Sequence, residues 1–236
     1  MNETSDSATF NFTTTEGFQF RTQFESSLSE QEKWWIAPRN MRSMKFFVAC
    51  LLDAGLKEVI ASIASLQKIE DPIVYTAGFM LVGPTKKWPE IHTDGPDRKC
   101  KRGSILIPIK LLDGSGPEIL IQKSDDTFVQ VKYSANAALY LPEDLPHQTT
   151  RQEGRWFRHQ DLRIMLDVAI GPAELPKKKK ELKELAIFMT PFYPWPEGDD
   201  IADEGFVEWV SNWVDEYKKI NFSSLVKKEK VLDKNT

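Results

Sequence analysis

Cysteine and histidine are scarce in this chain, whose 236 residues include two cysteines and three histidines. Cys50 and Cys100 lie far apart and match no metal-binding or redox spacing. Because Cys50 falls in an apolar helical stretch, we expect it to be a buried structural thiol. The two cysteines fit a reducing compartment, although they do not exclude a single disulfide.

Long apolar runs and an excess of positive charge are also missing. No run approaches the roughly 18 apolar residues that a membrane span requires, and the first ten residues lack the basic and apolar regions of a secretory signal. The net charge of -4 and a single basic run, 177–180, give no support for a nucleic-acid partner. The sequence therefore predicts a cytoplasmic protein that binds neither membranes nor nucleic acids.

The composition is that of a globular protein, with 41% hydrophobic and 28% charged residues. Its length predicts one domain over residues 1–236. The N-terminal region, residues 10–70, begins with β-forming residues from Phe10 to Phe24 around a central Glu16-Gly17, which predicts a hairpin or two short strands. A short helix capped by Ser29 is then predicted over Ser27–Trp35.

Two later stretches have helical periodicity. From Met41 to Leu66 the apolar residues form a helical stripe with a break near Gly55, and such a helix is expected to pack against the outside of a sheet. The C-terminal extension, residues 173–220, predicts two further helices. The second of these carries apolar residues at helical spacing: Phe206, Val210, Trp213 and Tyr217.

Short runs rich in Val, Ile, Tyr and Leu fill the region between these helices, residues 73–170. Turn-forming residues separate the runs, which is typical of an antiparallel sandwich or barrel. The predicted strands are Ile73–Val82, Ser104–Leu112, Glu118–Gln122, Thr127–Tyr133, Ala137–Leu141 and Leu162–Ile170.

Two of the three histidines occur in a pattern that suits a metal ion. His92 and Asp94 are separated by one residue, so in an extended strand both side chains project to the same face. His147 follows 55 residues after His92, next to another predicted strand. Two neutral nitrogens and one carboxylate oxygen form the 2-His-1-carboxylate set that suits Fe(II) and oxygen chemistry. His159 lies in a polar run and is expected to be a surface loop residue.

Residues 73–170 resemble the double-stranded β-helix core of the 2-oxoglutarate/Fe(II) dioxygenases, especially the compact prolyl-hydroxylase-like and phytanoyl-hydroxylase-like members. The features that carry the resemblance are a His-x-Asp after one strand, a distal His147 near another, and an arginine that opens the following strand. The resemblance implies a mostly β jelly-roll core with N- and C-terminal helices packed outside it. It also implies a catalytic Fe(II) held by His92, Asp94 and His147, with 2-oxoglutarate and O2 consumed and ascorbate helpful.

The same resemblance implies a basic residue that binds the far carboxylate of 2-oxoglutarate. Arg163 opens a cleanly alternating strand, in which Arg163, Met165, Asp167 and Ala169 are predicted to face the cavity. Arg163 follows His147 by 16 residues, however, whereas the family more often places its basic residue nearer to the spacing of Arg158, which follows by 11. The strand context favours Arg163, and Arg158 stays the alternative.

The resemblance implies oxidation of an unactivated C–H bond, with release of succinate and CO2. Because halogenating relatives lack the carboxylate ligand, Asp94 favours hydroxylation or a related oxidation. The substrate class stays open between a small molecule, a free amino acid and a peptidyl side chain. Two other functions also stay open: a cupin-type metalloenzyme that does not use 2-oxoglutarate, and a metal-free β-sandwich binding module.

Overall fold

The computed structural model describes residues 6–26, 33–84, 90–94, 101–111, 118–150, 162–177, 179–189 and 204–232. The N-terminal part consists of strands β1 (Asp6–Thr13), β2 (Gln19–Ser26), β3 (Lys33–Pro38) and helices α1 (Met41–Leu51) and α2 (Lys57–Gln67). The following strands are β4 (Pro72–Val82), β5 (Gly103–Lys110), β6 (Ile119–Gln122), β7 (Phe128–Val131), β8 (Leu139–Pro142), β9 (His147–Thr149) and β10 (Arg163–Pro172). Helices α3 (Lys179–Met189) and α4 (Glu204–Leu232) end the described chain.

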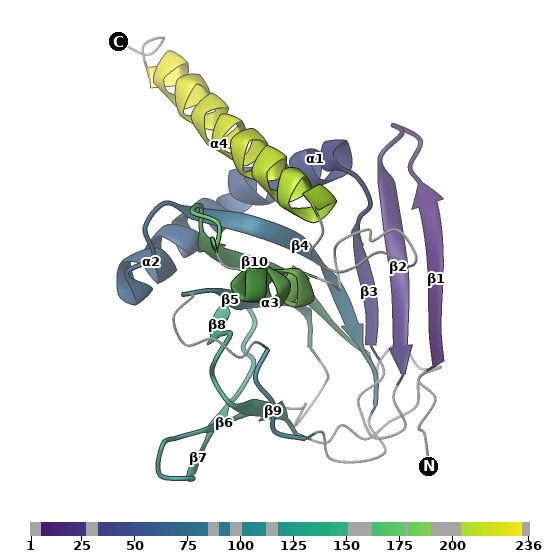
Figure 1. The fold of residues 1–236 in the computed structure, drawn as a ribbon, viewed down its shortest axis with the longest axis vertical. Coiled ribbons are helices and arrows are strands. Elements are labelled where there is room, and N and C mark those ends of the chain that lie inside the picture. The colour runs from purple at the N-terminus through teal and green to yellow at the C-terminus, as the bar shows by residue number, and fades with distance from the viewer. Residues whose placement is uncertain are drawn as a thin grey trace.

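The strands form two antiparallel sheets. The larger sheet has seven strands in the order β1-β2-β3-β4-β10-β5-β8, and the smaller sheet has three in the order β7-β6-β9. In Figure 1 the small sheet lies on one side of the large sheet, while α1, α2 and α4 lie on the other side. The described part of the chain is therefore mostly β, with helices flanking the larger sheet.

From β4 onward the strands pair as in a jelly roll. β4 pairs with β10, the segment at His92 bridges His147 at the start of β9, β5 pairs with β8, and β6 pairs with β7. The chain from β4 to β10 is thus a long hairpin. One arm runs from β4 to β6 and the other from β7 to β10, and they pair with each other along their length. Pairing of β10 with β5 and of β9 with β6 rolls this hairpin up. This is the topology of a double-stranded β-helix, and the predicted fold class is confirmed.

The N-terminal strands extend the larger sheet beyond the jelly roll. The predicted hairpin is present as β1 and β2, with Gly17 in the left-handed conformation at the turn. The predicted helix over residues 27–35 is wrong at its end, because Lys33–Trp35 belong to β3. The rest of that prediction, residues 27–32, lies outside the described residues. Strand β3 pairs with β2 on one side and β4 on the other. Its aromatic and β-branched residues suit a strand with neighbours on both sides.

Helices α1, α2 and α4 cover the outer face of the larger sheet, as the apolar stripes predicted. Their buried residues form one apolar cluster with outward-facing residues of β4, β5 and β10. The expected break between α1 and α2 is a π-helical turn, Leu52–Leu56, in which Gly55 has a φ of 107°. Glycine is favoured there because this φ is costly for other residues. No helix in the described chain is long and apolar enough to cross a membrane.

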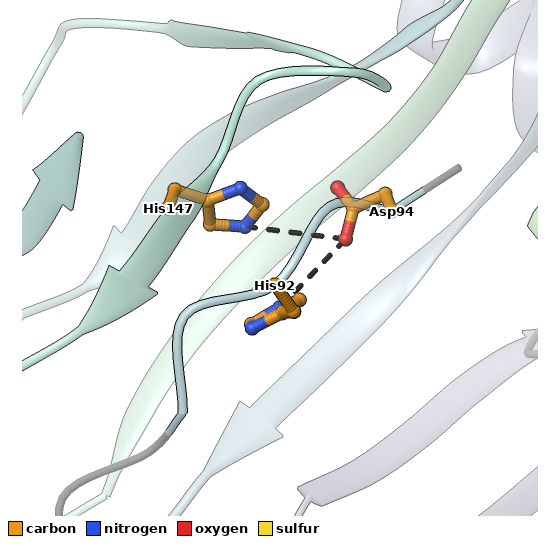
Figure 2. Close-up of side chains that lie close together, drawn as sticks. All are labelled: His92, Asp94 and His147. Carbon is orange, nitrogen blue, oxygen red and sulfur yellow. Dashed lines mark ion pairs between the residues drawn. The ribbon is translucent and has the colours of Figure 1, made fainter. Parts of the chain in front are cut away.

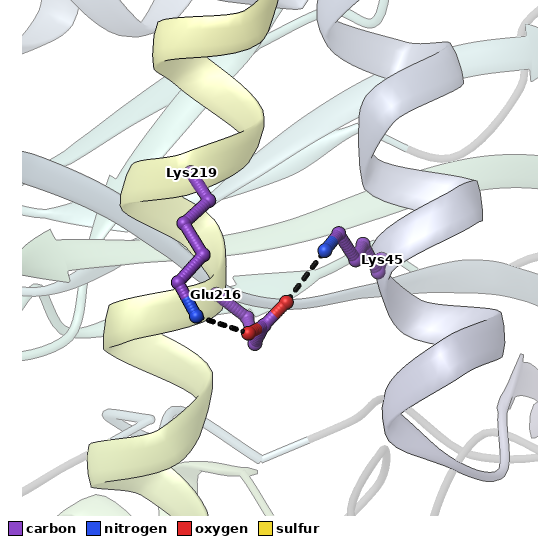
Figure 3. A network of polar contacts seen from close by, with 3 residues as sticks. All are labelled: Lys45, Glu216 and Lys219. Carbon is purple, nitrogen blue, oxygen red and sulfur yellow. Dashed lines mark hydrogen bonds and ion pairs between the residues drawn. The ribbon is translucent and has the colours of Figure 1, made fainter.

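Trp213 attaches α4 to the sheet. Its side chain is fully buried, and its indole N–H donates a hydrogen bond of 2.7 Å to the carbonyl of Val74 in β4. On the surface, Glu216 of α4 accepts hydrogen bonds from Lys45 of α1 and from Lys219 (Figure 3). The bond from Lys219, followed by the bond from Lys45, lowers the pKa of Glu216 to about 2. Because the folded state lowers this pKa, the ionised Glu216 stabilises the fold at pH values above the ordinary carboxyl pKa. That stabilisation is lost as the pH falls towards 2.

The inner face of the larger sheet forms a second apolar cluster with residues of the small sheet. Its buried members are Trp35, Ala37, Met80, Val82, Leu106, Ile119, Leu141 and Met165. The predicted alternation of β10 holds at its start, where Met165 belongs to this inner cluster. Ala169 packs with residues of the outer cluster, and the register of β10 against β4 shifts between Ala169 and Ile170.

The prediction for Cys50 is wrong. Cys50 is a free thiol and its side chain is exposed. The apolar stripe of α1 buries Met44 and Val48, and Cys50 lies on the same helix but outside that stripe. Helical spacing, more than the apolar character of the neighbouring residues, therefore decides which side chains of this helix are buried.

Candidate metal centre

His92 and His147 are held together by the backbone. They form an isolated antiparallel bridge, in which each residue donates its N–H to the carbonyl of the other over 2.9 Å. The two residues are directly opposite each other, so their side chains project to the same side of the pair. Their imidazole rings lie 4.6 Å apart between centroids. Two residues 55 positions apart in sequence thus present their rings to the same site.

Asp94 completes the cluster from the same segment as His92. Its Oδ1 lies 3.9 Å from Nε2 of His92 and 3.9 Å from Nε2 of His147 (Figure 2). One potential ligand atom from each of the three residues lies within 4.8 Å of the others. His147 is buried, whereas Asp94 is partly exposed and His92 is 45% exposed. The cluster is therefore open to solvent on the side of His92.

These distances are compatible with a metal ion after a small inward movement of the side chains. Two ligand atoms at right angles, each about 2.1 Å from one ion, would be roughly 3 Å apart. The observed separations of 3.9 Å exceed this by about 1 Å, within a cluster whose ligand atoms all lie within 4.8 Å of one another, and the bridge holds the two histidine backbones together. The donor set of two nitrogens and one carboxylate oxygen suits Fe(II) with open coordination positions.

Both imidazole rings are oriented for binding through Nε2. Nδ1 of His92 lies 2.9 Å from the carbonyl of Glu90, and Nδ1 of His147 lies 2.9 Å from the carbonyl of Leu145. A neutral imidazole that donates from Nδ1 keeps its lone pair on Nε2. Burial lowers the pKa of His147, although Asp94 opposes this effect. The neutral form of His147, which is the form that binds metals, is therefore favoured.

A buried arginine lies on the inner face of the larger sheet beside Tyr133. Arg163, the first residue of β10, is 2% exposed, and its guanidinium carbon lies 5.1 Å from the centroid of the Tyr133 ring. Burial raises the pKa of Tyr133, and Asp94 raises it further. Tyr133 is thus within reach of the charges of both Arg163 and Asp94.

Sequence reasoning predicted Arg163 but missed Tyr133. Tyr133 closed a predicted strand over Thr127–Tyr133, whereas β7 ends at Val131, so alternation along the strand could not indicate which way its ring points. Lys33 was also missed, because residues 27–35 were predicted to be helical. Its charge lowers the pKa of His147 and that of Asp167. Arg158 and His159 lie outside the described residues.

The sequence matches no family model and no curated protein. Among solved structures, the chain is similar to a prolyl-4-hydroxylase from Pseudomonas putida, with 17% sequence identity and a TM-score of 0.41, over 60% of this chain and 72% of that chain. It is also similar to the structure of Fe(II)-HppE with the alternative substrate (S)-1-HPP, with 11% identity and a TM-score of 0.27, over 39% of this chain and 40% of that chain.

Proposed function

We propose that this protein is an Fe(II)- and 2-oxoglutarate-dependent oxygenase that oxidises an unactivated C–H bond, releasing succinate and CO2. The observation that carries the proposal is the convergence of His92, Asp94 and His147 on one site in a jelly-roll core. Two histidines and one carboxylate are the ligand set of non-haem iron oxygenases that keep open coordination positions. The substrate is a small molecule or an amino-acid or peptidyl side chain.

The three ligand residues have distinct roles in this proposal. His92 and His147 would supply Nε2, with each ring held by its Nδ1 hydrogen bond to a backbone carbonyl. Asp94 would supply the anionic oxygen that lies between the two histidines. When bound, the iron and 2-oxoglutarate supply the oxidising chemistry, while the protein positions the reactants and limits water. The buried side of the site, at His147, is where water is most restricted.

Arg163 and Tyr133 support the use of 2-oxoglutarate. The guanidinium is a fixed cation with donors that can bind a carboxylate through two hydrogen bonds. Tyr133, whose ring lies beside the guanidinium, carries a phenolic O–H that is a further donor. Burial raises the pKa of Tyr133 and the charge of Asp94 adds to this effect, so Tyr133 lies within electrostatic range of the metal centre. We propose that Arg163 and Tyr133 hold the far carboxylate of 2-oxoglutarate.

A cupin-type metalloenzyme without a co-substrate would need the triad but not a buried arginine and tyrosine beside it. A metal-free binding module would need neither the metal-binding triad nor the buried arginine and tyrosine. The direct test is the release of succinate from 2-oxoglutarate by purified protein with Fe(II), O2 and ascorbate, screened against amino acids, peptides and small metabolites. Succinate release that requires Fe(II) supports the proposal. Tight metal binding without succinate favours the cupin-type enzyme, and absence of metal binding favours the binding module.

Replacement of Arg163 should weaken the binding of 2-oxoglutarate. We expect Arg163→Gln to raise the concentration of 2-oxoglutarate at half-maximal succinate formation by roughly 10–150-fold, because a charge-assisted hydrogen-bonded pair is lost. The 2-oxoglutarate requirement of Arg163→Lys should lie between those of Arg163→Gln and the wild type, since lysine keeps the charge but cannot form the two parallel hydrogen bonds. Arg158→Gln serves as the matched control and should change the requirement much less. A larger effect from Arg158→Gln than from Arg163→Gln would reverse the assignment.

A further inference from the structure

A buried acid, Asp167, lies on β10 on the same side as Arg163. Along β10 it is preceded at alternate positions by Arg163 and Met165, which face the space between the two sheets. Asp167 is 5% exposed. The negative charge of Asp94 acts on it, second only to burial. The alternation from Arg163 and Met165 therefore places Asp167 on the inner face of the larger sheet, within electrostatic range of Asp94.

The carboxylate of Asp167 is incompletely satisfied within the described part of the chain. Ser104 of β5 hydrogen-bonds the side chain, but Oδ1 has no hydrogen-bond partner among the described residues. Lys33 also acts on Asp167, but more weakly than burial, Asp94 and Ser104. An unpaired oxygen on a buried carboxylate is costly, because a buried acceptor loses its hydrogen bonds to water. A structural role would be better served by an apolar residue at this position.

The residues paired with Asp167 in the sheet are a glycine and a leucine, Gly78 of β4 and Leu106 of β5. Gly78 therefore places no side chain directly opposite the carboxylate. Asp167 thus offers a buried acceptor oxygen without a hydrogen-bond partner among the described residues, on the inner face of the larger sheet.

We propose that Oδ1 of Asp167 binds a protonated amine of the substrate, so that the preferred substrates are amino acids or other amines with a free ammonium group. This inference rests on the proposed function and specifies the substrate class of the same site. An ammonium group supplies both the missing hydrogen bond and a compensating positive charge. Burial and the charge of Asp94 raise the pKa of Asp167 to about 7, and a bound ammonium group would favour its ionised form.

The test uses matched pairs of compounds and two readouts. Wild-type protein with Fe(II) and 2-oxoglutarate is assayed for succinate formation with free amino acids and diamines, each compared with its N-acetylated counterpart. The best amine is then titrated without O2 into wild-type protein, Asp167→Asn and Asp215→Asn, and binding is measured by calorimetry. Asp167→Asn keeps the size of the side chain, and Asp215→Asn removes an exposed acid from α4.

The free amines should stimulate succinate formation more than their N-acetylated forms. Binding of the amine should weaken by roughly 10–150-fold in Asp167→Asn, the loss expected for a hydrogen bond to a charged group, and should be unchanged in Asp215→Asn. Succinate formation without preference for free amines, or equal binding by wild type and Asp167→Asn, would overturn the inference while leaving the proposed function intact. Absence of Fe(II)-dependent succinate formation with every compound would instead count against the proposed function itself.

Discussion

His147→Ala should remove Fe(II)-dependent turnover of 2-oxoglutarate while leaving the fold largely intact. His147 is expected to supply a ligand nitrogen from the buried side of the metal centre. Replacement of a residue that only orients a ligand typically costs 10–100-fold in metal affinity or activity. Loss of the ligand itself should therefore reduce succinate formation by more than about 100-fold. The measurement is the initial rate of succinate formation at saturating 2-oxoglutarate.

Gln148→Ala is the matched control for this variant. Gln148 follows His147 in β9 and pairs with Leu120 of β6, so its side chain projects to the other face of the small sheet. Its replacement should leave turnover close to that of the wild type. Thermal unfolding of both variants checks that the protein is folded. Retention of a substantial rate by folded His147→Ala would contradict the assignment of His147 as a ligand.

Trp213→Ala should destabilise the protein by about 3–5 kcal/mol, the range for truncation of a large buried aromatic side chain. Trp213 is the largest fully buried side chain among the described residues, and it joins α4 to β4 through the carbonyl of Val74. Its replacement leaves a cavity beneath α4 and removes the hydrogen bond to that carbonyl. The free energy of unfolding in urea, measured for wild type and variant, gives the difference directly.

Trp213→Phe separates packing from hydrogen bonding. It keeps an aromatic ring in the outer cluster but cannot donate to the Val74 carbonyl, so we expect a smaller loss than in Trp213→Ala. The two losses differ because apolar burial outweighs one neutral hydrogen bond, worth about 1 kcal/mol.

Truncation after Pro172 should likewise give insoluble or partly unfolded protein. A soluble, cooperatively folding truncation that binds iron but no longer oxidises substrate would make the C-terminal segment a substrate lid.

Local patterns in the sequence predicted most of the elements near the metal centre. The alternation of side chains in a strand explains why His92 and Asp94 reach the same site. The helical stripe with a break near Gly55 predicted α1 and α2 and the interruption between them, which the structure shows to be a π-helical turn. The strands of the core were predicted close to their observed bounds because turn-forming residues separate them. These features depend on neighbours along the chain, which a single sequence displays.

Features that depend on contacts across the sheet were less accessible. Lys33–Trp35 form part of β3 because β2 and β4 pair with them, and no local pattern records those partners. The register shift of β10 against β4 at Ala169 depends on the partner strand, and the approach of Tyr133 to Arg163 depends on a segment beyond the end of β7. The meeting of His147 with His92 was predicted from the residue types and their places next to predicted strands, and the resemblance to a family supported it, since their spacing alone does not define a bridge.

The central claim is that His92, Asp94 and His147 bind one iron ion to which 2-oxoglutarate can add. Its most direct test is an anaerobic titration of the purified protein with Fe(II), in the presence of 2-oxoglutarate, followed by visible absorption. We predict a charge-transfer band that saturates at one Fe(II) per chain, requires 2-oxoglutarate and is lost in Asp94→Ala. A band of equal intensity and affinity in folded Asp94→Ala, or no saturable binding of Fe(II) by the wild-type protein, would contradict the claim.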